Sequence, residues 1–130
     1  MNRNRRGFTL IELLIVVVIL GILTAIVVPK FGNGKERAMV ASMRSDLRNL
    51  VSAEEAHFTN ALAYYNGVIP DPLFRYSPTE GVTITLSDVT ASGWAAEALH
   101  ATSTRTCAIF VGAAAPIAPA TVEGQVACTP

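Results

Sequence analysis

Residues 5–29, RRGFTLIELLIVVVILGILTAIVVP, decide how the rest of this chain is organised. The run from 8 to 28 is almost wholly apolar, and its one charged side chain is Glu12. As a helix rising about 1.5 Å per residue, the run would extend about 30 Å, the thickness of one bilayer hydrocarbon core. The stretch therefore predicts a membrane-spanning helix, and it raises the question of why a carboxylate lies inside it.

Basic side chains precede the apolar run. Arg3, Arg5 and Arg6 lie ahead of Gly7 without an acidic neighbour, so the positive-inside rule places the N-terminus in the cytoplasm and the body outside. The run is longer than the apolar part of a secretory signal, and no small-x-small cleavage pattern follows it. The rest of the chain keeps seven basic against ten acidic side chains, which gives no reason to expect nucleic-acid binding.

Glu12 lies about one helical turn inside the apolar run. A carboxylate at the bilayer centre costs about 3 kcal/mol, and less near the interface, where the side chain can reach the cytoplasmic headgroups. The alternative is that this intramembrane carboxylate awaits a partner. A positive group that can lie at the same depth is a new N-terminal amine on a neighbouring chain, which requires cleavage just before Phe8.

The basic leader, Gly7, Phe8, Glu12 and the proline that ends the apolar run resemble the N-terminus of type IV prepilins and the related pseudopilins. The resemblance covers residues 5–29 and implies that a prepilin peptidase cuts after Gly7 and methylates the new amine of Phe8. It also implies that Glu12 pairs with the N-terminal amine of an adjacent subunit during filament assembly. Buried ion pairs contribute little net stability, so we expect Glu12 to set the register between subunits while apolar packing supplies the adhesion.

A soft joint is predicted where the apolar run ends. Pro29 lacks an N–H and disturbs a helix, and Gly32 and Gly34 weaken it further. Beyond them, apolar side chains recur on one face of a helix that we expect to reach residue 60: Met39, Met43, Leu47, Leu50 and Phe58. We expect one long helix with one stripe packed on a globular body, and we expect the joint to unwind when the subunit enters a filament.

Residues 61–130 are predicted to form a connecting loop and an antiparallel sheet. The loop, 61–81, carries turn signals and four aromatic side chains that we expect to hold it against the helix and sheet: Tyr64, Tyr65, Phe74 and Tyr76. Residues 82–90 alternate apolar and polar, 93–102 are assigned to a strand from their alternation and position, and 104–112 are rich in β-branched and aromatic residues. The predicted fold class is α+β, with three or four antiparallel strands across a long helix, as in the type IV pilin fold.

The expected organisation has four parts: a leader (1–7), a membrane or filament-core helix (8–29), an amphipathic helical half (30–60), and a loop and sheet with a disulfide-bounded C-terminal region (61–130). Cys107 and Cys128 are the two cysteines. Beyond the membrane we expect them to form a disulfide, worth about 3 kcal/mol for a loop of this length. The alternative is two free buried thiols.

No arrangement for catalysis or metal binding is recognisable. His57 and His100 lack metal-ligand spacing and are interpreted as surface or packing side chains, and no nucleophile elbow or phosphate loop accompanies them. Glu54 and Glu55 are interpreted as a solvated helix face. Glu123 alone supplies a carboxylate side chain in the last 20 residues, which is a poor calcium site. We expect no enzyme activity, no cofactor and no metal.

The function predicted is that of a major-type pilin, a structural subunit of an extracellular type IV pilus. The resemblance implies a helical homo-oligomer with four kinds of partner: a prepilin peptidase, an assembly ATPase, a platform protein and a secretin. The precursor would reside in the inner membrane and the mature subunit in a surface pilus. The alternatives are a pseudopilin of a type II secretion system in a periplasmic pseudopilus, a minor pilin, or a membrane-tethered periplasmic domain with an uncleaved anchor.

Overall fold

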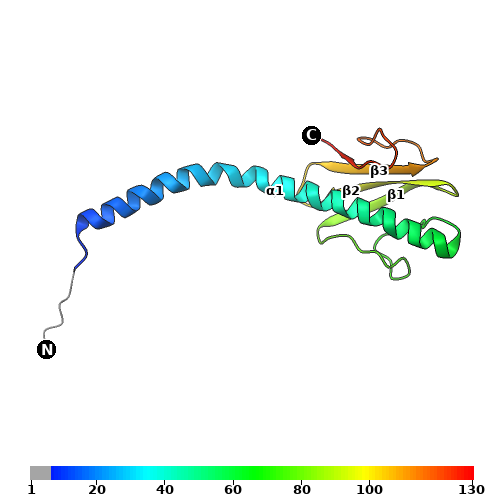
Figure 1. Cartoon of the computed structure of the whole chain (residues 1–130), viewed down its shortest axis with the longest axis horizontal. Helices are drawn as coiled ribbons and strands as arrows, with labels where there is room; N and C mark the ends of the chain where they lie inside the picture. The colour runs from blue at the N-terminus through cyan, green and yellow to red at the C-terminus, as the bar shows by residue number, and fades with distance from the viewer. Residues whose placement is uncertain (1–6) are drawn as a thin grey trace, which may run out of the picture. The chain divides into compact units, whose positions relative to one another are not determined.

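The computed structural model describes residues 7–130, except for the side chains of 28–33, so Arg3, Arg5 and Arg6 of the predicted leader lie outside the described residues. One helix and four strands follow in order (Figure 1): α1 Leu10–Ala61, β1 Val82–Thr90, β2 Gly93–His100, β3 Thr106–Gly112 and β4 Ala127–Cys128. The chain divides into two compact units, Met1–Lys35 and Glu36–Pro130, and each is described by itself.

Helix α1 is predicted from its apolar run and from the stripe that follows. Its helical assignment continues from Leu10 to Ala61 and includes Pro29, Gly32 and Gly34. A proline in a helix interior removes one backbone hydrogen bond, so this region is the weakest part of the helix by composition. The unwinding that we expect at residues 29–34 concerns the filament and stays a prediction.

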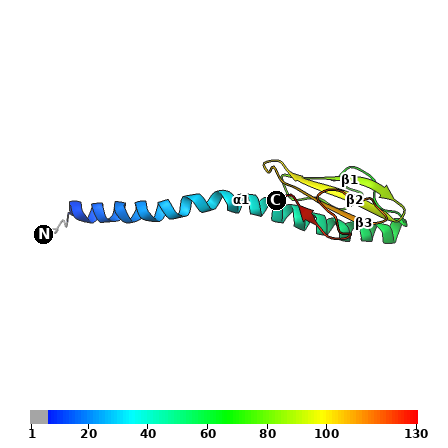
Figure 2. The same ribbon diagram turned by 90° about the horizontal axis from the view of Figure 1, so that it is seen from above.

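The four strands of the second unit form one antiparallel sheet with the order β1-β2-β3-β4. The register pairs Val82 with His100 and Ala98 with Cys107, and β4 pairs Cys128 with Cys107. Figure 2 shows β1, β2 and β3 lying along the C-terminal part of α1. The predicted α+β class, with a long helix on an antiparallel sheet, is confirmed, and the count is four strands.

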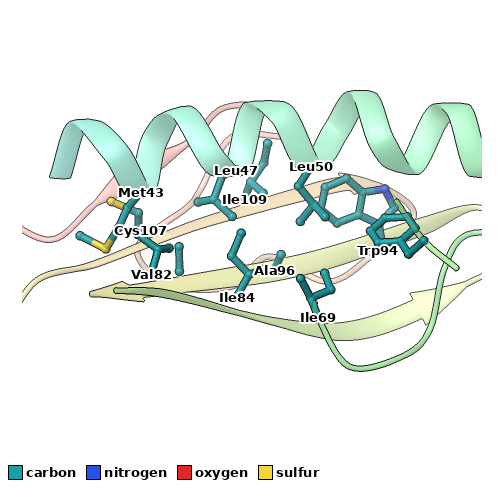
Figure 3. Close-up of a cluster of buried hydrophobic side chains, with 12 residues drawn as sticks. Met43, Leu47, Leu50, Ile69, Val82, Ile84, Trp94, Ala96, Cys107 and Ile109 are labelled. Carbon is teal, nitrogen blue, oxygen red and sulfur yellow. The ribbon is translucent and has the colours of Figure 1, made fainter. Parts of the chain in front are cut away.

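The main core lies between this part of α1 and one face of the sheet (Figure 3). The predicted helix stripe supplies it, because Met43, Leu47 and Leu50 are fully buried and Met39 is 8% exposed. The sheet contributes side chains that alternate along its strands, and the loop contributes two more: Val82, Ile84, Trp94, Ala96, Ala98, Cys107 and Ile109 from the strands, and Ile69 and Phe74 from the loop.

A second, smaller core covers the opposite face of the sheet. Ala95, Ala108 and Phe110 pack there against Ala114 and Ala120 from the segment that follows β3. Burial on both faces explains why four consecutive residues of β2 and four of β3 are buried. Ile117 and Ala127 are partly buried against the same cluster, so the C-terminal segment forms a thin apolar cover on this face of the sheet.

Candidate functional site

The N-terminal half of α1 exposes an apolar surface on every side. Residues Leu10–Val27 have a mean hydropathy of 3.1, and none of this stretch is buried within the chain. Its leucine, isoleucine and valine side chains are about half exposed or more, and Phe8 ahead of it is 83% exposed. Such a surface is unfavourable in water at about 25 cal/mol per Å², so it requires lipid or other apolar helices around it.

Glu12 forms a capping box with Thr9 at the start of α1. Its Oε2 accepts hydrogen bonds from the Thr9 backbone N–H at 2.9 Å and from the Thr9 hydroxyl at 2.8 Å, and the Glu12 N–H donates back to the Thr9 hydroxyl oxygen at 3.3 Å. This reciprocal arrangement satisfies backbone N–H groups that have no partner inside the helix. This cap was not predicted from the sequence, although T-L-I-E before an apolar run is the pattern that indicates it.

The geometry leaves part of the Glu12 carboxylate available. Both bonds from Thr9 end on Oε2, and in the described part of the chain Oε1 accepts no hydrogen bond. Glu12 is therefore able to keep its cap and to accept a cationic donor on Oε1. Since Phe8 precedes Thr9 directly, an amine created at Phe8 would carry a positive charge at the same end of the helix.

The structure shows the surroundings of some of the other residues predicted for leader cleavage and for the helix joint, but not their processing or unwinding. Gly7 is exposed, and among the described residues no atom beyond its chain neighbours lies within 4 Å of the position that an added Cβ would take. Gly34 is equally open, and Pro29 and Gly32 fall among the residues whose side chains are not described. Cleavage after Gly7 and methylation of Phe8 therefore stay predictions.

Cys107 and Cys128 form a disulfide that joins β3 to β4. Cys107 is fully buried in the main core, Cys128 is partly buried, and neither is a free thiol. The guanidinium Nε of Arg44 on α1 lies 3.2 Å from the Cys128 sulfur. The bridge thus holds the end of the C-terminal segment against the sheet and the helix.

Two buried carboxylates on α1 were not found from the sequence. Asp46 is 4% exposed, and its two oxygens accept hydrogen bonds from the Thr79 backbone N–H at 2.9 Å and the Thr79 hydroxyl at 3.0 Å. The hydroxyl of Tyr76 also donates to the Asp46 carbonyl oxygen at 2.8 Å. Asp46 therefore fixes the end of the 62–81 loop to the helix.

Glu54 fixes the beginning of the same loop, and its assignment to a solvated helix face was wrong. Its side chain has no exposed surface, and Oε2 accepts a 2.8 Å hydrogen bond from the backbone N–H of Tyr65. Desolvation raises the pKa of Glu54 to about 7, the Tyr65 bond opposes this, and the charge of Glu55 adds to it. Only Glu55 of the predicted pair is exposed.

Aromatic rings hold the middle of the loop, as expected. Tyr65 stacks on Phe74 with ring centroids 4.2 Å apart, and the imidazole of His57 meets both rings edge-on. The Tyr65 hydroxyl donates to Asp71 at 2.6 Å, which raises the pKa of Tyr65 to about 12 and lowers the pKa of Asp71. His57 is thus a packing side chain.

No group of three or more potential metal ligands occurs among the residues that the structure describes. Hollows border the loop in the described part of the chain, and the one between Pro70 and Ser77 has a volume of about 480 Å³. Neither this hollow nor the others brings together a nucleophile, a base and an oxyanion donor within the described residues.

Known proteins resemble the chain most clearly at its N-terminus. Residues 2–28 match the family described as the prokaryotic N-terminal methylation motif. The chain is 41% identical over 63 residues to the type IV major pilin protein PilA of Myxococcus xanthus, a match that covers 48% of this chain and 29% of that protein. It is 40% identical over 63 residues to the type II secretion system core protein G of Pseudomonas aeruginosa, covering 48% and 44%.

The type IV major fimbrial protein FimA of Dichelobacter nodosus is 44% identical over 55 residues, covering 42% of this chain and 35% of that protein. The chain thus matches less than half of the length of each of these relatives. It carries the N-terminal methylation motif, and the relatives that it matches are type IV pilins and type II secretion pseudopilins.

Proposed function

We propose that this protein is a major-type pilin, the repeating structural subunit of an extracellular type IV pilus. The observation that carries the proposal is a helix with an apolar surface exposed on every side, capped by a carboxylate of which one oxygen accepts no hydrogen bond among the described residues. The surface suits a membrane before assembly and a bundle of like helices afterwards. Processing after Gly7 by a prepilin peptidase would supply the amine that Glu12 lacks.

Assembly follows from two separate forces in this proposal. Packing of leucine, isoleucine and valine side chains between neighbouring helices provides the attraction, because each buried side chain makes many dispersion contacts. The Glu12 Oε1 and the methylated amine of Phe8 on the next subunit provide the register. An unpaired carboxylate buried in the apolar bundle costs several kcal/mol, so a subunit displaced along the axis is disfavoured.

The proposed pilin function implies four kinds of partner. The precursor would be inserted in the inner membrane and cut by the prepilin peptidase, and an assembly ATPase and a platform protein would add subunits to a homo-oligomeric filament that leaves through a secretin. A minor pilin would have the same processing. The Cys107–Cys128 pair, together with the lack of a calcium-like acidic loop in the last 20 residues, favours a pilus over a periplasmic pseudopilus.

A pseudopilin of a type II secretion system is the second candidate, and the similarity to core protein G of Pseudomonas aeruginosa favours it. The two functions differ in where the filament lies. Surface-sheared filaments that contain the protein support the pilin. Protein that stays in the periplasmic fraction while protein export depends on it supports the pseudopilin.

The first test is the intact mass of protein sheared from cell surfaces. We expect a chain that starts at Phe8, carries one added methyl group and lacks two hydrogens because of the Cys107–Cys128 disulfide. A full-length chain retained in the membrane fraction would contradict the assembly role of Glu12. That result would favour the membrane-tethered periplasmic domain.

Two matched variants separate pairing from capping at Glu12. Glu12→Gln keeps a side-chain acceptor at the capping-box position but removes the charge, so we expect normal helix formation and a loss of filaments. Thr9→Val removes the capping hydroxyl but keeps the charge, so we expect filaments to form. Filament yields that fall with Thr9→Val and not with Glu12→Gln would show that Glu12 acts only as a cap.

A further inference from the structure

Glu54 lies in the main core without enough hydrogen-bond donors for a charged carboxylate. Its Oε2 has one donor, the Tyr65 backbone N–H, and its buried Oε1 has none within the described residues. Among the described residues, one other buried side-chain polar atom lacks a hydrogen-bond partner, the indole Nε1 of Trp94. A buried carboxylate that is ionised with a single donor is costly, because nothing replaces most of its hydration.

Trp94 and Glu54 face the same layer between helix and sheet. Figure 3 shows the Trp94 ring beside Leu50, with its nitrogen on the side nearer to α1. Residues four apart share a helix face, so Glu54 follows Leu50 on the buried stripe. The sole tryptophan of the protein is therefore placed to report on the state of this carboxyl group.

The groups around Glu54 give little support to its charged form. On α1 the neighbouring Glu55 carries a like charge, and His57 contributes an imidazole whose ring meets the Tyr65 ring at 5.6 Å. From the loop, the Tyr65 N–H favours the ionised form, whereas the Tyr64 and Tyr65 side chains bring phenols rather than cations. From β2, Trp94 brings a buried indole N–H that has no partner among the described residues.

We propose that Glu54 is a proton-operated clamp, which holds the beginning of the 62–81 loop against α1 when it is protonated and loosens this end of the loop when it ionises. Ionised Oε1 requires water, and water reaches it only if the loop near Tyr65 moves away from α1. The loop carries Leu62 and Val68, which are 80% and 83% exposed, so the movement would alter an apolar part of the outer surface. The clamp responds to the pH of the medium that bathes the body, and it does not rest on the proposed function.

The direction of the pH dependence follows from the position of the pKa. Because the folded-state pKa of Glu54, about 7, exceeds its ordinary value of 4.5, the folded state binds the proton more tightly than the unfolded state does. The contribution to stability is present in full below the ordinary value and is lost as the pH rises toward the folded value. From pH 5.5 to 8.5, the unfolding equilibrium constant should therefore rise about 30-fold because of this group.

The test uses the full chain in detergent micelles. We would record Trp94 fluorescence from pH 5 to 9 and urea unfolding at pH 5.5 and 8.5, on the wild type and on three single variants. We expect a fluorescence transition with its midpoint near pH 7 in the wild type, in Glu55→Gln and in His57→Gln, and its absence in Glu54→Gln. Between pH 5.5 and 8.5, the unfolding equilibrium constant should increase less than about threefold in Glu54→Gln, and this reduction should occur in no other variant.

Two further measurements keep the test decisive. Infrared spectra of the wild type should show a protonated carboxyl C=O band that disappears near pH 7, which requires no variant to fold. Hydrogen exchange of the amides around Tyr65, corrected for the intrinsic rate at each pH, should accelerate through the same range. A fluorescence transition that survives in Glu54→Gln, one that disappears in His57→Gln, or a wild type without the infrared change would overturn the clamp.

Discussion

Replacing Asp46 by alanine should loosen the end of the 62–81 loop and destabilise the body. Asp46 is 4% exposed, and both of its oxygens accept hydrogen bonds from Thr79. Alanine removes both acceptors. It leaves the Thr79 N–H and hydroxyl without protein partners, and it leaves a gap beside the helix.

The magnitude follows from those two bonds. A hydrogen bond to a charged group contributes about 1.5–3 kcal/mol, and the loss of both would approach twice that value if water could not replace them. Thr79 is exposed, so water will form hydrogen bonds with some of its unpaired N–H and hydroxyl groups. We therefore expect Asp46→Ala to lower the free energy of unfolding by about 2–3 kcal/mol. Asp46→Asn keeps an oxygen acceptor for the Thr79 N–H and should cost about 1 kcal/mol.

Urea unfolding of the full chain in detergent, followed by Trp94 fluorescence, measures these differences if the transition is two-state. Thr79→Ala is the matched control, because it removes the hydroxyl bond and retains the backbone bond. Hydrogen exchange should show faster opening at residues 77–81 in Asp46→Ala than in the control. A cost below about 0.5 kcal/mol for Asp46→Ala, or equal costs for alanine and asparagine, would refute the reasoning.

Three other changes test the packing of the body. The double change Cys107→Ser and Cys128→Ser should lower the free energy of unfolding by about 3 kcal/mol, and equal urea midpoints with and without the bridge would contradict this. Leu47→Ala should cost about 2–5 kcal/mol in the same assay, since Leu47 is fully buried in the main core. Gly67→Ala should displace the Tyr65 ring, because the added Cβ would overlap the Tyr65 hydroxyl; the pKa of that phenol, now about 12, should then fall in an absorbance titration.

Apolar periodicity was sufficient to predict the helix and the sheet. The stripe from Met39 to Leu50 and the alternation in residues 82–90 each reflect burial of one face, which is a property of the pattern itself. Residues 93–100 were harder to assign, because their alternation is obscured when the C-terminal segment covers the second face of the sheet. Contacts of that kind join residues far apart in the sequence, and no local pattern records them.

The buried carboxylates escaped prediction for a different reason. The helix stripe has a spacing of eight residues between Leu50 and Phe58, and Glu54 lies at the midpoint. A search for apolar side chains passes over that position, although its place on the stripe already indicates burial. The Thr9–Glu12 cap was also not predicted, because one carboxylate at this position is both a charge in an apolar run and a hydrogen-bond acceptor for the helix N-terminus.

Asp46 and Glu54 lie on one face of α1 and hold the two ends of the same loop, yet their surroundings predict opposite behaviour. Asp46 meets two donors from Thr79, one for each oxygen. Glu54 meets one donor, and its second oxygen faces a core that offers no partner among the described residues. The two attachments thus differ in the number of donors rather than in the depth of burial, and in our proposal the missing donor makes the Glu54 end of the loop pH-dependent. Adding a donor should remove the pH dependence proposed for the Glu54 end of the loop. A change beside Glu54 that supplies an amide N–H to Oε1 should abolish the fluorescence transition of Trp94 while keeping the carboxyl group.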